Sequence, residues 1–247
     1  MNAVILAGGR GTRLAPYTAV LPKPLVPVGD IPILEVIIRQ LIACRFARVT
    51  LCLGHLGELI RAYFAAHPTL TRQIEFEFVD EEQPTGTAGS LRLIPELLET
   101  FLVMNGDVLT TLDYVQLFEA HRASGAWLTI AGHQKQVNID LGVLKLQAGE
   151  VVDYIEKPTY VYPVSMGVYI YDRRALEYIP RGRHFDFPDL VLQLLAHQKK
   201  VACFESDALW LDIGRPEDFG AAQAVFARNQ EQFRMAGWPP APRATRT

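Results

Sequence analysis

Short apolar runs alternate with longer segments of helical periodicity through the first half of this 247-residue chain. Each run suits one buried strand, and in each following segment the apolar residues recur every three or four positions, as on one face of a helix. The runs are AVILA (3–7), VTLCLG (49–54), IEFEFV (74–79), FLVMNGD (101–107) and WLTIAGH (127–133). The helical segments between them are 33–45, 56–66, 87–98 and 112–125. This repetition predicts an α/β sandwich of three layers, in which helices cover both faces of a mainly parallel sheet.

The pattern changes after residue 132. LGVLKL (141–146), GEVVDYIEKP (149–158) and SMGVYIYD (165–172) are typical of strands, with few helical segments between them, and they predict a small antiparallel portion attached to the sheet. We expect helices at 187–200 and 216–229, and strands at 201–206 and 208–214. The acidic residues Asp80, Glu81 and Glu82 are expected to form a solvated turn.

The chain contains no linker that would separate two domains. We therefore expect one domain over residues 1–228, followed by a poorly ordered tail at 229–247 that contains prolines and arginines.

Composition limits the possible partners. A formal net charge of −3 does not favour a general nucleic-acid partner, and no segment approaches the roughly 20 apolar residues of a membrane span. Cys44, Cys52 and Cys203 lie among apolar neighbours without the spacing of metal ligands, which favours reduced core residues and a cytoplasmic protein. A homo-oligomer remains possible.

The first strand leads into LAGGRGTRLAPYTAVLPKP (6–24), in which three glycines are followed by positive charge at Arg13 and at Lys23 between two prolines. Glycine lets the backbone approach a ligand closely, and arginine and lysine bind phosphate oxygens. A dinucleotide motif would need glycine where Leu14 stands, and a Walker loop would need lysine directly after the glycines. The loop instead predicts a nucleoside-triphosphate site at the carboxyl end of the first strand.

This stretch resembles the amino-terminal signature of the sugar-1-phosphate nucleotidyltransferases. The resemblance continues in the family's order over residues 2–220, through QPTGTAGSL (83–91), MNGDV (104–108), YIEKP (154–158), MGVYIYD (166–172) and WLDIG (210–214). It implies a Rossmann-like sandwich and an enzyme that condenses a nucleoside triphosphate with a sugar 1-phosphate. The products of that reaction are a nucleotide sugar and pyrophosphate.

The resemblance also implies roles for individual residues. The catalytic residues are Arg13, Lys23 and Asp107. The nucleotide-binding residues are Leu6, Ala7, Gly8, Gly9, Gly11, Thr12, Gln83, Gly86 and Thr87. The residues that bind the sugar phosphate are Gly142, Glu156, Lys157, Ser165 and Gly167.

Two aspartates match the family's metal ligands. A single aspartate after a strand usually forms a turn or caps a helix, but Asp107 and Asp212 each lie beside a glycine at the expected end of a strand. Two carboxylates together with substrate phosphates suit a magnesium ion (Mg2+). We expect both aspartates to end strands of one sheet, where ligand sites form.

The motifs do not determine which base and which sugar the substrates carry. QPTGTAG resembles the guanylyltransferases for mannose or heptose phosphates, so GTP is favoured, with UTP or dTTP and glucose 1-phosphate possible. Relatives often have asparagine where this chain has Ser165, which leaves the sugar open. The alternative function is an inactive subunit that senses nucleotide sugars, but such a subunit would be expected to lose charged residues that this chain retains.

Overall fold

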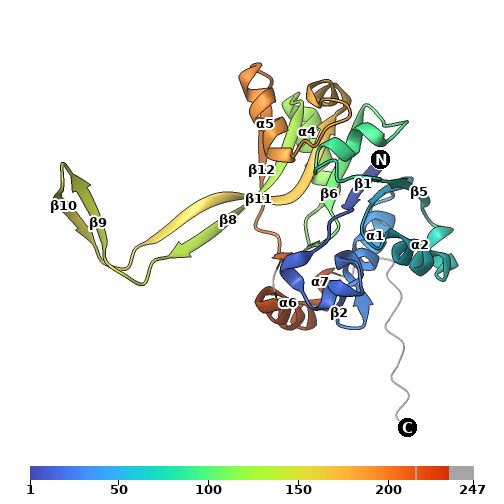
Figure 1. Ribbon diagram of the computed structural model, residues 1–247, viewed down its shortest axis with the longest axis horizontal. Coiled ribbons are helices and arrows are strands. Elements are labelled where there is room, and N and C mark those ends of the chain that lie inside the picture. Colours follow the sequence, from blue (N-terminus) through green and yellow to red (C-terminus); the bar gives the residue numbers. More distant parts are fainter. Residues whose placement is uncertain (215, 234–247) are drawn as a thin grey trace, which may run out of the picture.

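The computed structural model describes residues 1–214 and 216–233. A seven-stranded sheet runs through the molecule in the order β12-β8-β11-β6-β1-β4-β5 (Figure 1). Its strands are β1 (Asn2–Ala7), β4 (Arg48–Leu53), β5 (Glu75–Asp80), β6 (Thr100–Asn105), β8 (Leu128–Asn138), β11 (Thr159–Asp172) and β12 (Val201–Glu205). Strand β11 pairs antiparallel with β6 and β8, and the other neighbours in the sheet pair in parallel. The prediction of a mixed, mainly parallel sheet is confirmed.

Helices cover both faces of the sheet, as the sequence predicts. The α-helices are α1 (Ile33–Ala43), α2 (Gly57–Ala65), α3 (Pro68–Thr71), α4 (Tyr114–Ser124), α5 (Phe187–Ala196), α6 (Pro216–Arg228) and α7 (Gln230–Phe233). Because side chains alternate along a strand, Ala3 and Ile5 of β1 join a core with α1, α2, α4 and α6, whereas Val4 joins a second core with α5. These two cores and the sheet between them form the three layers.

The short 3-10 helices are η1 (Thr12–Leu14), η2 (Tyr17–Ala19), η3 (Lys23–Leu25), η4 (Gly89–Leu93) and η5 (Arg173–Tyr178). The helix predicted over residues 87–98 is therefore wrong, because that segment contains only η4. Ile94 precedes Pro95 and adopts an extended conformation with φ of −78° and ψ of 120°, since proline disfavours helical geometry in the residue before it.

Three pairs of strands lie outside the main sheet. They are β2 (Pro27–Val28) with β3 (Ile31–Pro32), β7 (Val108–Thr110) with β13 (Trp210–Asp212), and β9 (Val143–Gln147) with β10 (Glu150–Ile155). The pairing of β13 with β7 differs from the expectation that Asp107 and Asp212 both end strands of one sheet. Asp212 is the last residue of β13, which reaches the site as a separate antiparallel partner of β7.

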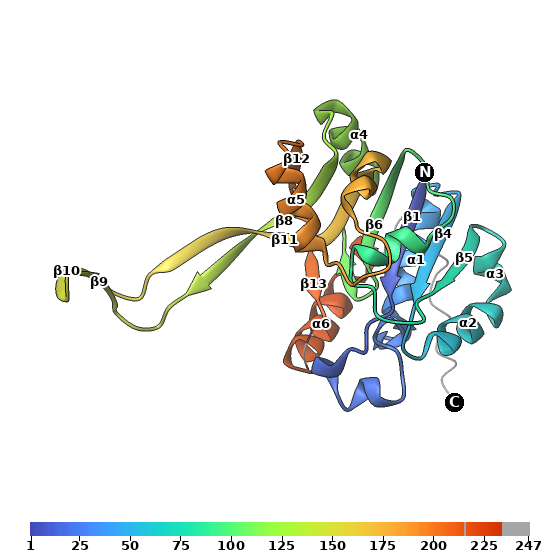
Figure 2. The same cartoon turned by 45° about the horizontal axis from the view of Figure 1, so that its top comes forward.

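Strands β8 and β11 continue beyond the sheet as a two-stranded ribbon. Their register is unbroken from Gly132↔Ser165 to Asn138↔Thr159, and the β9–β10 hairpin follows at the far end. We call residues 133–164 the arm; it projects from the body of the molecule in both views (Figures 1 and 2). The predicted antiparallel portion is thus present, and it forms a projection rather than part of the packed body.

The carboxyl-terminal part that the structure describes packs against the core. Residues 230–233 form α7, and Phe233 is fully buried with its ring 5.3 Å from that of Phe226. An apolar contact thus holds residues 230–233, the first part of the predicted tail, and the domain boundary at residue 229 stays a prediction. Residues 234–247, the rest of the predicted tail, lie outside the described residues.

The cysteines differ in burial. Cys52 is buried in the second core, but Cys203 lies exposed on the edge strand β12, so the prediction of a core position is wrong for Cys203. None of the helices in the described ranges is long and apolar enough to cross a membrane.

Candidate active site

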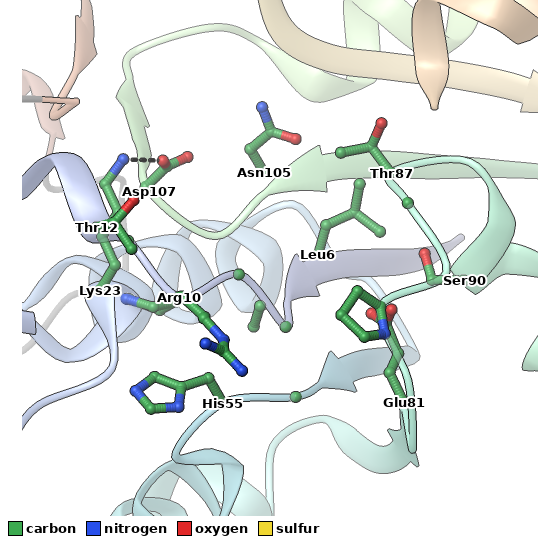
Figure 3. A pocket seen from close by; sticks show the side chains of 18 of the residues that line it. Leu6, Arg10, Thr12, Lys23, His55, Glu81, Thr87, Ser90, Asn105 and Asp107 are labelled. Atoms are coloured by element: carbon green, nitrogen blue, oxygen red, sulfur yellow. Dashed lines mark hydrogen bonds and ion pairs between the residues drawn. The ribbon is translucent and has the colours of Figure 1, made fainter. Parts of the chain in front are cut away.

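A cavity of about 650 Å³ opens where β1, β4, β5 and β6 end (Figure 3). Eleven of the residues singled out from the sequence line it: Leu6, Ala7, Gly8, Gly9, Gly11, Thr12, Arg13, Lys23, Gly86, Thr87 and Asp107. These come from three separate segments, and the sheet brings them together because the carboxyl ends of parallel strands share one edge. We call this the first cavity.

The loop after β1 owes its path to glycine. Gly11 has a φ of +61°, a left-handed conformation that glycine adopts without a steric penalty, and its carbonyl accepts a hydrogen bond of 2.9 Å from the Thr18 hydroxyl. The turn places Thr12 and Arg13 in η1 at the cavity wall. Arg10 and Arg13 then border the same space as the backbone of the loop, as a site for phosphates requires.

Lys23 and Asp107 form an ion pair at the wall of the first cavity (Figure 3). Lys23 lies in η3 between Pro22 and Pro24 and is only 8% exposed, so its charge needs a partner. Asp107 supplies that partner from the turn between β6 and β7. The pair holds a cation and a carboxylate at one point of the cavity wall, although 84 residues separate them in the chain.

Asp212 reaches the same region through the pairing of β13 with β7. Its register partner is Val108, the residue after Asp107, so the two aspartates are brought close together. The pKa of Asp212 is raised above its ordinary value, first because the surrounding protein partly desolvates the carboxylate and then because Asp107 adds negative charge nearby. Lys23 and Arg13 lower the pKa and only partly offset this.

These two carboxylates fit a divalent cation. A cation between them would remove the repulsion that raises the pKa of Asp212. Among residues 1–214 and 216–233, no cluster of three or more histidine, cysteine, aspartate or glutamate side chains could hold a metal ion. Two carboxylates whose remaining ligands are water and phosphate oxygens match the way proteins hold magnesium with phosphate substrates.

A second cavity of about 570 Å³ adjoins the first, and the two share Thr87 and Asn105. Ser165, Gly167 and Asp212 line it, so three more of the predicted site residues lie here. Its other walls are mainly apolar, formed by residues that include Met166, Tyr169, Phe187, Val191, Leu192 and Trp210. Gly167 has a φ of +75°, and a Cβ atom there would lie 2.8 Å from the Asn105 amide nitrogen, so glycine is required at this contact.

Four predicted site residues line neither cavity. Gln83 is exposed beside the first cavity, and Gly142, Glu156 and Lys157 lie on the arm, away from the body. Glu156 accepts a hydrogen bond of 2.8 Å from the Tyr154 hydroxyl, and Lys157 is exposed with a φ of +46°. The roles of these four residues stay predictions.

Comparison with known proteins identifies the family. A family model described as nucleotidyl transferase matches residues 2–229. The chain belongs to the nucleotidyl transferase family. This confirms the resemblance that its motifs showed, and the match covers both cavities and the arm.

Two curated relatives of this nucleotidyl transferase have different substrates in their names. A UTP–glucose-1-phosphate uridylyltransferase of Synechocystis is 31% identical over 96% of this chain, and a mannose-1-phosphate guanylyltransferase of Mycobacterium tuberculosis is 31% identical over 92%. The chain spans just under two thirds of their lengths, 66% and 65% respectively. A crystal structure of HddC from Yersinia pseudotuberculosis is 26% identical, with a TM-score of 0.68 over 91% of this chain and 99% of that one.

Among the residues of the first cavity that the sequence analysis gave no role, three shape its walls. Glu81 follows β5 and accepts hydrogen bonds from the Thr85 hydroxyl at 2.7 Å and its amide at 3.2 Å, so the predicted solvated turn is wrong for Glu81. Asp186 accepts a 3.0 Å bond from the Thr87 amide and caps α5. Both carboxylates hold the loop at 82–87 in place, Glu81 through Thr85 four residues along the chain and Asp186 through Thr87, which is 99 residues away in the sequence.

Gly54 is the third. It follows β4, and a Cβ atom there would lie 2.5 Å from the Gly8 carbonyl oxygen, so the two backbones touch. The next residue, His55, donates its amide hydrogen to the same carbonyl at 3.2 Å. A glycine at the end of the strand after the glycine-rich loop was the available sequence signal, because parallel neighbours end at the same edge of the sheet.

We expect Gly54→Ala to lower the thermal unfolding temperature and, if the first cavity binds a nucleoside triphosphate as proposed below, to raise the KM for it, because the added methyl group displaces the Gly8 backbone. Steady-state kinetics and calorimetry measure the two effects. Gly9→Ala is the matched control for stability, since a Cβ atom there meets no atom within 4 Å. Equal unfolding temperatures for the two variants would contradict the close contact between the Gly54 and Gly8 backbones.

Proposed function

We propose that this chain condenses a nucleoside triphosphate with a sugar 1-phosphate and releases pyrophosphate. The observation that carries the proposal is the first cavity, where a glycine loop, Arg13, Lys23 and a pair of aspartates meet beside a second, mainly apolar cavity. A triphosphate fits the charged cavity and a sugar the adjoining one. The family match and the names of the relatives support these two classes of substrate.

The reaction places electrostatic demands on the site. A phosphate oxygen of the sugar 1-phosphate attacks the α-phosphorus, and the bond from that phosphorus to the oxygen of the β-phosphate breaks. The attacking oxygen is already an anion, so no general base is required. Catalysis therefore consists of alignment and charge stabilisation, as in other phosphoryl-group transfers.

Each cationic group then has a task. Arg13 binds phosphate oxygens and Lys23 stabilises the pyrophosphate as it leaves, while the loop at 8–11 offers backbone amides to the triphosphate. Asp107 and Asp212 would hold magnesium, which supplies the charge that draws the two polyanions together. Asp107 also keeps Lys23 oriented through their ion pair.

Substrate selection is assigned to three groups of residues. Gln83 and Gly86 contact the base; Gly142, Glu156, Ser165 and Gly167 contact the sugar; and Lys157 binds the sugar phosphate. GTP is the favoured triphosphate, which agrees with the Mycobacterium tuberculosis relative and with a second HddC structure that is complexed with GMP-PN. UTP and dTTP remain competitors, as the Synechocystis relative indicates.

A substrate matrix tests this function. Pyrophosphate release is measured for five nucleoside triphosphates, each with mannose, heptose and glucose 1-phosphates and with magnesium. We expect release to need both substrates and to be fastest with GTP and mannose or heptose 1-phosphate. Equal or faster release with UTP or dTTP would reject the guanine preference, and binding without release would favour a nucleotide-sugar sensor.

The aspartate pair gives a second prediction. Asp107→Asn and Asp212→Asn should each slow turnover by about 10²–10³ and raise the magnesium concentration needed for half-maximal rate, because each removes one negative charge from the metal site. Asp113→Asn is the control. Asp113 is the N-cap of α4, and asparagine caps a helix as well as aspartate does. Wild-type rates and magnesium dependence in both site variants would rule out a shared metal site.

Lys157 gives a third prediction. Lys157→Ala should raise the KM for the sugar 1-phosphate by roughly 10- to 150-fold, the loss of one charge-assisted contact of about 1.5–3 kcal/mol, and leave triphosphate binding unchanged. Lys135→Ala removes a charge from the ribbon of the same arm and should leave both constants near wild type. An effect of Lys157→Ala confined to the triphosphate would be inconsistent with the assigned role.

A further inference from the structure

The hairpin at the end of the arm has one apolar face. Residues directly opposite in an antiparallel pair share a face, so Leu144 and Tyr154 lie with Leu146 and Val151 on one side of the hairpin. All four are more than half exposed. The other face presents the opposed charges of Lys145 and Asp153 beside the apolar pair Val143 and Ile155. An apolar face is typical of a hairpin that packs against another surface, and none of the core residues in the described ranges lies on the arm, which projects clear of the body (Figure 2).

Apolar exposure is concentrated on the arm and its hairpin. Of the eighteen exposed large hydrophobic side chains among the described residues, ten lie between 137 and 162. An isolated two-stranded hairpin is at best marginally stable in water, and a gathered apolar surface marks an interaction site. The arm therefore needs a partner surface.

The second cavity lacks a positive charge, and the arm carries one at Lys157. Among the described residues that line it, Asp212 has the only formal charge, and this charge is negative. A sugar 1-phosphate, which is the substrate under the proposed function, brings a phosphate that requires a cation. Lys157 stands at the junction of hairpin and ribbon, and its φ of +46° and the following proline restrict its backbone.

The arm is too straight for Lys157 to serve its own cavity. Ser165 lines that cavity, and from Ser165 to Thr159 the ribbon is paired with β8 without a break in register. Six residues of extended strand span about 20 Å, much longer than a lysine side chain. No bulge in this stretch offers a hinge.

We propose that the occupant of the arm is a second copy of this chain, and that Lys157 of each copy enters the second cavity of the other. Charge complementarity supports this, because the cavity needs a cation and the arm supplies one. The receiving surface is α5, where Leu192 and Leu195 are 64% and 53% exposed and Leu192 borders the cavity. A two-fold axis lets both copies exchange arms and covers both apolar faces.

Complementation between two impaired copies, assayed at a sugar 1-phosphate concentration far below the KM expected of Lys157→Ala, tests the exchange. One copy carries Asp107→Asn and the other Lys157→Ala, with different affinity tags, and the mixed species is isolated from co-expressing cells by two purification steps. An exchanged dimer then contains one site with an intact body and an intact arm, so we expect about half of the wild-type turnover. Turnover no higher than that of the single variants, or failure to obtain a mixed species, would overturn the proposal.

A measurement independent of activity separates this proposal from the proposed function. Sedimentation velocity should show a dimer for the wild type and a monomer for the double variant Leu144→Asp with Leu146→Asp, because the charges disrupt the apolar face. Lys145→Gln, on the opposite face of the same strand, should remain a dimer. A monomeric wild type rejects the arm exchange whatever its activity, whereas a dimer without pyrophosphate release rejects only the proposed reaction.

Discussion

The carboxyl end of β1 lies between those of β4 and β6, and parallel pairing on both sides determines where the glycine loop can run. Two backbone hydrogen bonds continue these pairings past the strands, from the Gly106 amide to Leu6 at 2.9 Å and from the His55 amide to Gly8 at 3.2 Å. The first brings the turn with Asp107 against the loop, and the second holds the loop against the end of β4. The charged groups of the first cavity depend on this backbone frame.

Charge is divided unequally between the two cavities. Arg10, Arg13 and Lys23 border the first cavity together with the carboxylates of Glu81, Glu82, Asp107 and Asp186, whereas the second cavity has mainly apolar walls and one charged side chain among the described residues, Asp212. The two aspartates lie between these environments, with Asp107 lining one cavity and Asp212 the other. Under the proposed reaction, a cation held by the two aspartates would supply positive charge to the phosphates of both substrates.

The sequence predicted what local patterns determine. Short apolar runs between segments of helical periodicity located the strands of the parallel sheet, since a strand buried on both faces needs a continuous apolar run. The motifs located the glycine loop, Lys23 and Asp107. It could not reveal that Asp212 reaches the site through a separate pairing with β7, because pairing partners distant in the chain leave no local signal. Gly54 was missed although a glycine at the end of β4 is a signal in the sequence, and Glu81 was missed because the hydrogen bonds that it accepts from Thr85 depend on the path of the loop.

The arm shows a different limit of prediction from sequence. Its strands were predicted from their β-branched and aromatic residues, but alternation alone does not say what covers the apolar face of a strand. Sequence motifs placed Gly142, Glu156 and Lys157 with the sugar phosphate, whereas the fold places them on a projection. Exchange of arms between two copies reconciles the two observations, since it returns these residues to a cavity without bending the ribbon.

Crystals grown with manganese in place of magnesium and with a non-hydrolysable triphosphate test the central claim most directly. Anomalous scattering locates manganese independently of the surrounding model of the protein. The account predicts one strong anomalous peak within coordination distance of the carboxylates of both Asp107 and Asp212 and of the α-phosphate. A peak bound by the triphosphate alone, with neither aspartate as a ligand, would contradict it.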